Sequence, residues 1–198
     1  MLVAGLTGGI GSGKTTIAKL LEQEGIPVYD SDVRAKYLMQ NSEKIKTILK
    51  KEFGNEVYTE EGLNREYLAK IVFNNKDKLS VLNAIVHPVV AKDFKDWVDS
   101  QDTEIVVKEA AILFESGSYK TCDVNINVHT DVEERIKRVQ NRDGVTREQV
   151  LSRINNQWTD EQRNKKADII IRNNDADSID INVKELIKKL KDKIEKEA

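Results

Sequence analysis

The most constraining feature of this sequence is a glycine-rich loop close to its first residue. Residues Gly8–Thr15 read Gly-Gly-Ile-Gly-Ser-Gly-Lys-Thr and match the phosphate-binding pattern G-x-x-x-x-G-K-[ST]. Glycines let backbone N–H groups approach phosphate oxygens closely, Lys14 adds a mobile positive charge, and the Thr15 hydroxyl is a ligand that Mg²⁺ accepts. A helix that begins directly after the loop turns its positive end toward the bound anion.

The residues on either side of the loop supply the context that the pattern requires. Met1–Leu6 is apolar and predicts a short buried strand, and Thr15–Glu22 has the apolar spacing of a helix. The alternative is a glycine-rich turn that matches the pattern by accident, and a strand before the loop with a helix after it argues against this. We therefore expect the loop to bind a nucleoside triphosphate.

Bulk composition excludes several other classes of protein. The chain has 198 residues, enough for one core with a small appended subdomain, and its net charge of −2 gives no global attraction to nucleic acid or to anionic membranes. Cys122 is the single cysteine, so no internal disulfide is possible and a buried, unreactive thiol is expected. No histidine pair has metal-ligand spacing, which argues against zinc. Without a signal-like start or an apolar run of about 18 residues, the sequence predicts a soluble cytoplasmic protein.

Apolar segments alternate with helical patterns along the chain, which indicates a parallel sheet covered by helices on both faces. The further candidate strands are 25–29, 105–107, 124–128 and 169–171. Two helical stretches, 33–98 and the arginine-rich 131–167, exceed what a minimal sheet needs for its connections. Apolar residues at three- and four-residue spacing over 183–194 predict a terminal amphipathic helix.

Two aspartates follow the second candidate strand. Open α/β sheets bind ligands beyond the carboxyl ends of their strands, so Asp30 and Asp32 lie near the loop if this strand neighbours the strand of the loop. Carboxylates in such a place act as a general base toward a hydroxyl or orient Mg²⁺ through water. The alternative is an Asx-type turn after a strand, and the phosphate-binding loop favours function.

Arginines of 131–167 form a second candidate cluster. Arg135, Arg138 and Arg142 are spaced by three and four residues, so they can share one helix face. Guanidinium groups on a closing lid stabilise the charge that develops in phosphoryl transfer, and Arg142, at the helix end, is our candidate for this role. For Arg135, a solvated, salt-bridged surface helix is the better prediction. A lone histidine in an apolar segment, His87, is typical of a structural hydrogen bond.

Taken in order, these motifs resemble those of one family, the dephospho-CoA kinases. The matching segments cover about the whole chain: Leu6–Thr15, Gly25–Asp32, Leu82–Pro88, Leu113–Glu115, Val139–Gly144, Ala167–Asp168 and Asn173–Asn174. The loop alone is shared by many families, whereas the D-x-D, His-Pro and Arg-Asp-Gly elements together are specific. The chain departs from the family at Ala111, where a proline is frequent, and at Lys36, which keeps the charge of a common arginine without its bidentate fork.

The resemblance implies a P-loop kinase of the nucleoside-monophosphate-kinase type. This fold is an α/β, three-layer core with a five-stranded parallel sheet, a helical substrate-binding insertion and a helical lid. The core would comprise 1–32, 99–130 and 168–198, the insertion 33–98 and the lid 131–167. The implied reaction transfers the γ-phosphate of ATP to the ribose 3′-hydroxyl of dephospho-CoA, giving coenzyme A and ADP, with Mg²⁺ as the metal.

The resemblance also implies roles for individual residues. The ATP phosphates would be bound by Gly11, Ser12, Gly13, Lys14, Thr15 and Thr16, with Mg²⁺ on Thr15. The candidate catalytic residues are Lys14, Asp32 as the base with Asp30 close behind, and Arg142. Asn173 lies where the family approaches the adenine, and His87 and Glu115 match elements on the substrate side.

Two other interpretations stay open at this point. The first is another small-molecule P-loop kinase acting on a nucleoside, a nucleotide or a sugar acid, and the D-x-D and His-Pro elements argue against it. The second is a switch or motor NTPase that binds protein partners. The sequence lacks the guanine-reading N-K-x-D element and the second glycine-rich signature that such proteins carry. The oligomeric state is not predicted.

Overall fold

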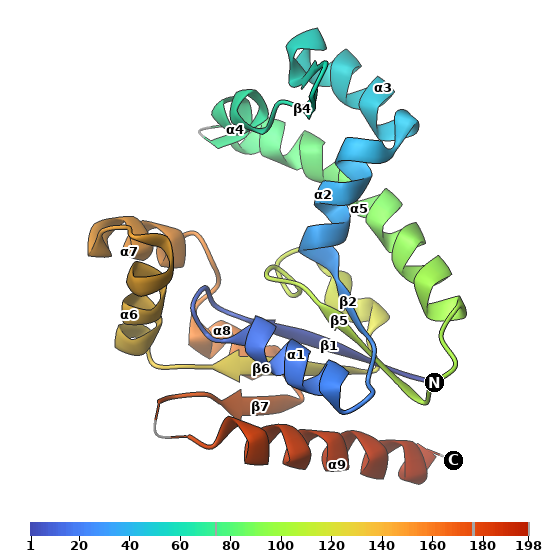
Figure 1. The fold of residues 1–198 in the computed structure, drawn as a ribbon, viewed down its shortest axis with the longest axis vertical. Helices are drawn as coiled ribbons and strands as arrows, with labels where there is room; N and C mark the ends of the chain where they lie inside the picture. The colour runs from blue at the N-terminus through green and yellow to red at the C-terminus, as the bar shows by residue number, and fades with distance from the viewer. Residues whose placement is uncertain (74, 176, 198) are drawn as a thin grey trace. The chain divides into compact units, whose positions relative to one another are not determined.

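The computed structural model describes residues 1–73, 75–175 and 177–197, which form two compact units (Figure 1). One unit consists of Met1–Asp30 with Gln101–Ala198, and the other of Ser31–Ser100. Within the described ranges, no helix is both long enough and apolar enough to cross a membrane.

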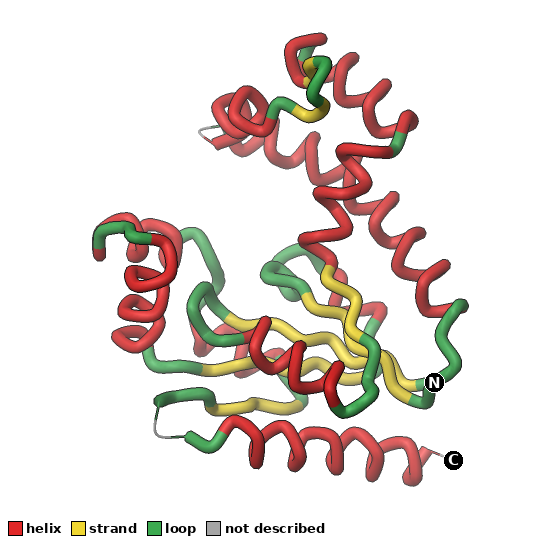
Figure 2. The backbone as a smooth tube through the Cα atoms, in the orientation of Figure 1, coloured by secondary structure: helices red, strands yellow, loops and turns green. Residues whose placement is uncertain are grey.

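The first unit is built on a five-stranded parallel sheet in the order β2-β5-β1-β6-β7. Its strands are β1 (Leu2–Gly8), β2 (Val28–Asp30), β5 (Ile105–Glu109), β6 (Val124–His129) and β7 (Ile169–Arg172). Its helices are α1 (Lys14–Gln23), α6 (Val132–Asp143), α7 (Arg147–Asn155), α8 (Asp160–Lys166) and α9 (Ile179–Glu197), with a 3-10 turn η2 (Ser118–Thr121). Figure 2 shows the strands running side by side among the helices, so the predicted three-layer α/β fold is confirmed.

Helices α1 and α9 cover one face of this sheet. Every second residue of β1, Leu2, Ala4 and Leu6, is buried in a cluster that also contains Ile17 of α1 and Leu186 of α9. Side chains alternate between the two faces of a strand and recur every 3.6 residues on a helix, so these spacings bring the apolar groups together. Burying one such aliphatic side chain contributes about 1.5–3 kcal/mol. The cluster thus fixes the strand that leads into the glycine-rich loop.

The opposite face of the same strands carries several buried polar side chains. Thr7 and Asn127 are buried on it, and Nδ2 of Asn127 donates to Oδ1 of Asn164 in α8 at 2.6 Å. The Sγ atom of Cys122 also lies here, 3.0 Å from where a Cβ on Gly5 would be. Burial raises the pKa of the Cys122 thiol to about 11, so the thiol stays protonated at neutral pH, as an unreactive cysteine does.

The second unit is mainly helical and has its own core. It contains α2 (Ser31–Asn41), α3 (Glu43–Phe53), α4 (Arg65–Phe73), α5 (Lys76–Asp99), a 3-10 turn η1 (Asn55–Val57) and a hairpin of β3 (Tyr58–Thr59) and β4 (Gly62–Leu63). Its core residues are Ile45, Leu49, Phe53, Val57 and Leu68. Arg34 of α2 forms a two-point ion pair with Asp93 of α5, at 2.6 and 2.9 Å. The hairpin was not predicted, because strands of two residues show no periodicity.

The strand order corrects one expectation. The placement of Asp30 near the loop depends on β2 being the neighbour of β1, and β5 separates these two strands. In register, Glu109 at the end of β5 pairs with Leu6 on one side and with Asp30 on the other. Strands joined by a long helical crossover need not be neighbours, since a later strand can enter between them. The acidic residue at the end of the strand next to β1 is therefore Glu109.

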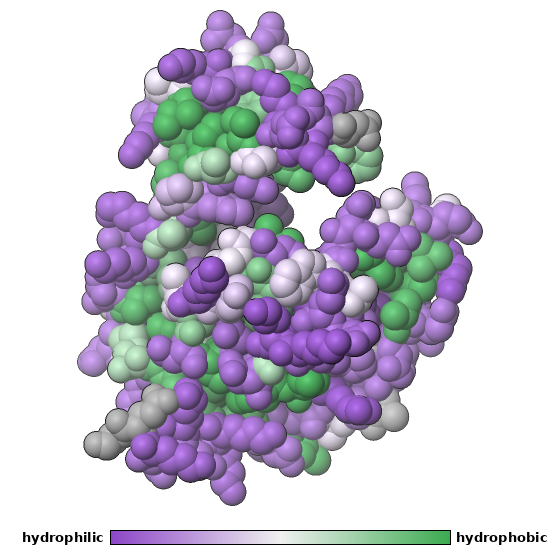
Figure 3. Space-filling model, turned by 180° about the vertical axis from the view of Figure 1, so that it is seen from behind, coloured by the Kyte–Doolittle hydropathy of each residue, from purple (hydrophilic) through white to green (hydrophobic). Residues whose placement is uncertain are grey.

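Charged and polar side chains dominate the face shown in Figure 3, with separate hydrophobic patches among them. Large hydrophobic residues that are exposed include Val33, Tyr37, Phe73, Ile170 and Ile181. Charged residues make up 33% of the sequence, which accounts for this surface.

Candidate active site

The glycine-rich loop joins β1 to α1, as the sequence predicts. Gly11 and Gly13 have φ angles of +79° and +89°, in the left-handed region that favours glycine, and they let the chain turn tightly. Gly13 is the N-cap of α1, so the positive end of this helix belongs to the loop. The Nζ atom of Lys14 donates to the carbonyl of Gly8 at 2.9 Å. A glycine loop at a helix N-terminus with a lysine is an anion-binding site.

Two buried side chains hold the C-terminal part of the loop. Nδ2 of Asn173 donates to the Ser12 carbonyl at 2.7 Å. The Thr130 hydroxyl lies 3.0 Å from the same carbonyl oxygen and 2.9 Å from that of Asn173. A Cβ on Gly13 would be 2.2 Å from Nδ2 of Asn173, so this close approach also requires glycine. These contacts place Asn173 against the loop itself, and its approach to adenine stays a prediction.

The structure corrects the prediction for Arg135. We expected a solvated side chain on a surface helix, but only 1% of the Arg135 side chain is exposed. Its Nε donates to the carbonyl of Ile10 at 2.9 Å, and its Nη1 donates to Oδ2 of Asp160 at 2.8 Å. The reason is that α6 packs directly on the loop: a Cβ on Gly11 would be 2.6 Å from the Arg135 carbonyl oxygen. A face that we expected to be solvated is therefore buried.

The segment between α7 and α8 also contacts the loop. The N–H of Ile10 donates to Oε1 of Gln157 at 2.9 Å. The next residue, Trp158, donates its N–H to Oε1 of Glu115 at 3.2 Å, and its ring stacks on that of Phe114 with centroids 6.1 Å apart. Glu115, expected on the substrate side, thus fixes this segment to the chain after β5. Its Oε2 is buried and has no hydrogen-bond partner among the described residues.

The later arginines of α6 are more exposed. Arg138 is 28% exposed and pairs with Asp175 at 2.7 Å. Its Nη1 lies 3.9 Å from where a Cβ on Gly13 would be, so this guanidinium reaches the loop. Arg142 is 63% exposed and pairs with Asp143 at 2.7 Å; this hydrogen bond, together with that from Arg153, lowers the pKa of Asp143 to about 2. Among the described residues, both hydrogen bonds of the Arg142 guanidinium go to Asp143, and its role on a lid stays a prediction.

Two acidic residues end neighbouring strands beside the loop strand. Asp30 ends β2 and Glu109 ends β5, where Glu109 is 8% exposed. The other candidate base, Asp32, belongs to the second unit, where it is exposed in the first turn of α2. The second unit also holds His87, half-buried inside α5 and followed by Pro88. The two aspartates of the predicted pair therefore belong to different units, Asp30 to the first and Asp32 to the second.

These residues fit a Mg²⁺ ion that is held mainly by nucleotide phosphates and water. The Thr15 side chain is exposed in the first turn of α1, and Asp30 and Glu109 offer carboxylate oxygens at strand ends. Over the ranges described, no group of three or more His, Cys, Asp or Glu residues could hold a metal ion. Mg²⁺ keeps several waters and takes one or two protein ligands beside phosphates, so it does not need such a group.

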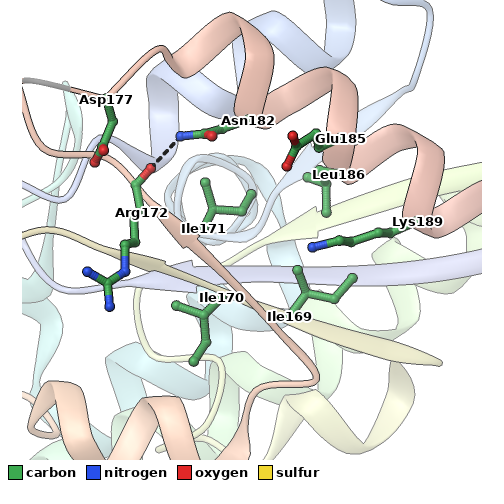
Figure 4. Close-up of a pocket in the computed structure, with 9 residues that line it drawn as sticks. All are labelled: Ile169, Ile170, Ile171, Arg172, Asp177, Asn182, Glu185, Leu186 and Lys189. Carbon is green, nitrogen blue, oxygen red and sulfur yellow. Dashed lines mark hydrogen bonds between the residues drawn. The ribbon is translucent and has the colours of Figure 1, made fainter.

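A separate depression of about 290 Å³ lies between β7 and α9 (Figure 4). Its lining includes Ile170, Arg172, Asn182 and Lys189, and Nδ2 of Asn182 donates to the carbonyl of Arg172 at 2.8 Å. The described residues that line it include none of the predicted site residues. We therefore assign it no part in the chemistry of the loop.

Three residues that lie at the loop or next to it were not predicted from the sequence. They are Glu109, Thr130 and Gln157. Glu109 ends β5 and Thr130 directly follows β6, and a polar residue at the carboxyl end of a buried strand was a usable signal. Gln157 lies between two helices, and no local pattern marks its contact with Ile10.

The loop follows the central strand of a parallel sheet, arginines pack against it, and acidic residues end the two strands on one side of it, an arrangement typical of a P-loop kinase. The family model for dephospho-CoA kinase matches residues 2–178. This chain belongs to the dephospho-CoA kinase family.

Individual relatives agree with this assignment. The chain is 37% identical over 191 residues to the dephospho-CoA kinase of Fusobacterium nucleatum, covering 96% of this chain and 95% of the relative. A crystal structure of a Thermus thermophilus protein is 32% identical, with a TM-score of 0.85 and 97% of both chains covered. The dephospho-CoA kinase structure from Campylobacter jejuni is 27% identical, with a TM-score of 0.68 and 95% and 96% of the two chains covered.

Proposed function

We propose that this protein transfers the γ-phosphate of ATP to the ribose 3′-hydroxyl of dephospho-CoA, giving coenzyme A and ADP in the last step of coenzyme A synthesis. The observation that carries the proposal is the Gly8–Thr15 loop, fixed by buried hydrogen bonds, in a chain of the dephospho-CoA kinase family. Because the reaction consumes ATP, we propose the cytoplasm as its location.

On the donor side, residues Gly11–Thr16 bind the phosphates through backbone N–H groups. Lys14 exchanges its hydrogen bond to the neutral Gly8 carbonyl for an ion pair with a phosphate oxygen. Such a contact grows stronger as negative charge develops on the transferred group, so Lys14 stabilises the transition state more than the bound substrate. Two observations support this role: a lysine side chain is mobile, and the Nζ atom of Lys14 already lies within the loop, at the Gly8 carbonyl.

On the acceptor side, Asp32 removes the proton from the 3′-hydroxyl of the ribose. At the same time the 3′-oxygen forms the new bond to the γ-phosphorus. The bond from that phosphorus to the bridging oxygen breaks, and the electron pair leaves with ADP. Asp30 is the alternative base. We place His87 and Glu115 on the substrate side, and the buried, unpartnered Oε2 of Glu115 supports a ligand donor at that point.

The segment 131–167 acts as the lid in this proposal, with Arg142 reaching the phosphoryl group on closure. A closed lid keeps water from competing with the acceptor hydroxyl. Thr15, together with Asp30 through water, would hold Mg²⁺, which neutralises charge on the phosphates when it is bound.

The test is an ADP-release assay with ATP and Mg²⁺, run with dephospho-CoA, with adenosine, with AMP and without acceptor. We expect ADP release that depends on dephospho-CoA. Faster turnover of AMP or adenosine would contradict the proposal and point to another small-molecule P-loop kinase.

A further inference from the structure

A buried charge cluster underlies the phosphate-binding loop and has no part in the roles given above. It consists of Arg135, Asp160 and Arg163. Asp160 accepts from Nη1 of Arg135 at 2.8 Å and from Nη2 of Arg163 at 2.5 Å. Both arginine side chains are only 1% exposed. Two guanidinium groups thus share one carboxylate, which leaves one net positive charge among the three side chains.

Arg135 connects this cluster to the loop in two ways. Its Nε donates to the carbonyl of Ile10 at 2.9 Å. Its guanidinium also lies flat against Gly9, because a Cβ on Gly9 would be 2.2 Å from Nη2 and 2.4 Å from Cζ. Nη2 is buried without a hydrogen-bond partner in the described ranges. Burying a guanidinium group costs desolvation free energy, and an arginine with an unpaired N–H group beside the loop therefore indicates a role there.

We propose that Arg135 is a positioning residue for nucleotide binding, which holds Gly9 and Ile10 in the shape that receives the phosphates. Asp160 and Arg163 fix the guanidinium from the far side, so that its bond to Ile10 is not lost to rotation. The cluster thereby joins α6 and α8 to the loop. The proposal rests on the proposed function only in taking an adenine nucleotide as the ligand of the loop.

The first experiment compares Arg135→Met, Arg135→Lys and a matched control, Arg147→Met. Arg147 lies in the same arginine-rich segment but is 46% exposed and pairs with Glu133 on the surface. We expect Arg135→Met to raise both the Kd for ADP and the KM for ATP by about tenfold or more, since a charge-assisted hydrogen bond to the loop is lost. The KM for dephospho-CoA and the constants of the control stay near their wild-type values.

Lysine tests the chemistry of the contact. Its ammonium group can donate to the Ile10 carbonyl but cannot bond Asp160 at the same time in a fork, so Arg135→Lys regains part of the affinity for ADP. A lower melting temperature with unchanged KM for ATP in Arg135→Met would show a purely structural role and overturn the proposal. Equal increases in both KM values, or Arg135→Lys no better than Arg135→Met, would also contradict it.

A double-mutant cycle isolates the contact with Gly9. Gly9 has no left-handed φ angle, so an alanine there adds a methyl group against Arg135 without backbone strain. We expect Gly9→Ala to weaken ADP binding in the wild type and to cost much less in the Arg135→Ala background, where the methyl group has room. The same cost in both backgrounds would contradict the proposal. If the double variant does not fold, the Kd for ADP of Gly9→Ala alone remains a readout, and a value equal to that of the wild type would contradict the proposal.

The two proposals fail in different ways. A wild-type protein that binds ADP but does not turn over dephospho-CoA would contradict the proposed function alone. In that case the Kd for ADP, measured without acceptor across the same variants, still decides whether Arg135 positions the loop.

Discussion

Thr130 offers an isosteric test of how the loop is held. Its side chain is completely buried, and its hydroxyl lies 3.0 Å from the Ser12 carbonyl and 2.9 Å from the Asn173 carbonyl. Thr130→Val keeps the shape and removes the hydroxyl. The Ser12 carbonyl still accepts a hydrogen bond from Nδ2 of Asn173 at 2.7 Å, whereas the Asn173 carbonyl loses the Thr130 hydroxyl as its donor. An acceptor buried without its donor costs about 1–3 kcal/mol, so we expect a loss of about 2 kcal/mol in the free energy of unfolding.

Urea unfolding with and without ATP measures this effect. With a slope of about 2 kcal/mol per molar, the urea midpoint of Thr130→Val falls by about 1 M. The Kd for ATP rises as well, because the Ser12 carbonyl loses one of its two hydrogen-bond donors and Ser12 directly precedes Gly13 and Lys14. Thr130→Ser keeps the hydroxyl and is the matched control. A midpoint and a Kd for Thr130→Val that equal those of the wild type would refute the idea that this hydroxyl holds the loop.

Three further predictions concern the reaction and its pH dependence. Lys14→Ala lowers kcat by about a hundredfold or more in steady-state kinetics, since a preorganised charge at the phosphoryl group is lost, and a near-normal kcat would contradict this. Asp32→Asn lowers kcat far more than it raises either KM, and the opposite result, with Asp30→Asn crippled instead, would assign the base to Asp30. Burial raises the pKa of Cys122 to about 11, so the folded state holds the thiol proton more tightly than the unfolded one. That stability is complete below a pH of about 9 and is lost toward pH 11 by at most about 1.4 kcal/mol per unit, so urea midpoints of wild type and Cys122→Ala that fall equally over this range would contradict it.

Local features could be predicted from the sequence. The loop is recognisable because its chemistry needs particular residues at fixed spacing, and the apolar alternation of β1 and the helical spacing of α1 place it between these elements. The end of α6 was predictable for a similar reason, since Gly144 supplies the left-handed residue after the helix, with φ of +65°.

Features that depend on distant pairings could not be predicted. The strand β5 enters between β2 and β1 through backbone pairing across long crossovers, and no local pattern encodes that order. Arg135 looks like a surface residue because its neighbours in sequence are charged. Its burial results from contacts with Ile10, 125 residues earlier, and with Asp160, 25 residues later. Such a side chain is identified only once α6 is docked on the loop.

The most direct test of the central claim is the identity of the phosphorylated product. Wild-type protein and Lys14→Ala are incubated with ATP, Mg²⁺ and dephospho-CoA, and the product is analysed by mass spectrometry and ³¹P NMR. Our account predicts coenzyme A with its new phosphate on the ribose 3′-oxygen, formed with one ADP per product and nearly absent with Lys14→Ala. A phosphate on another position, or unchanged dephospho-CoA beside ADP and free phosphate, would contradict it.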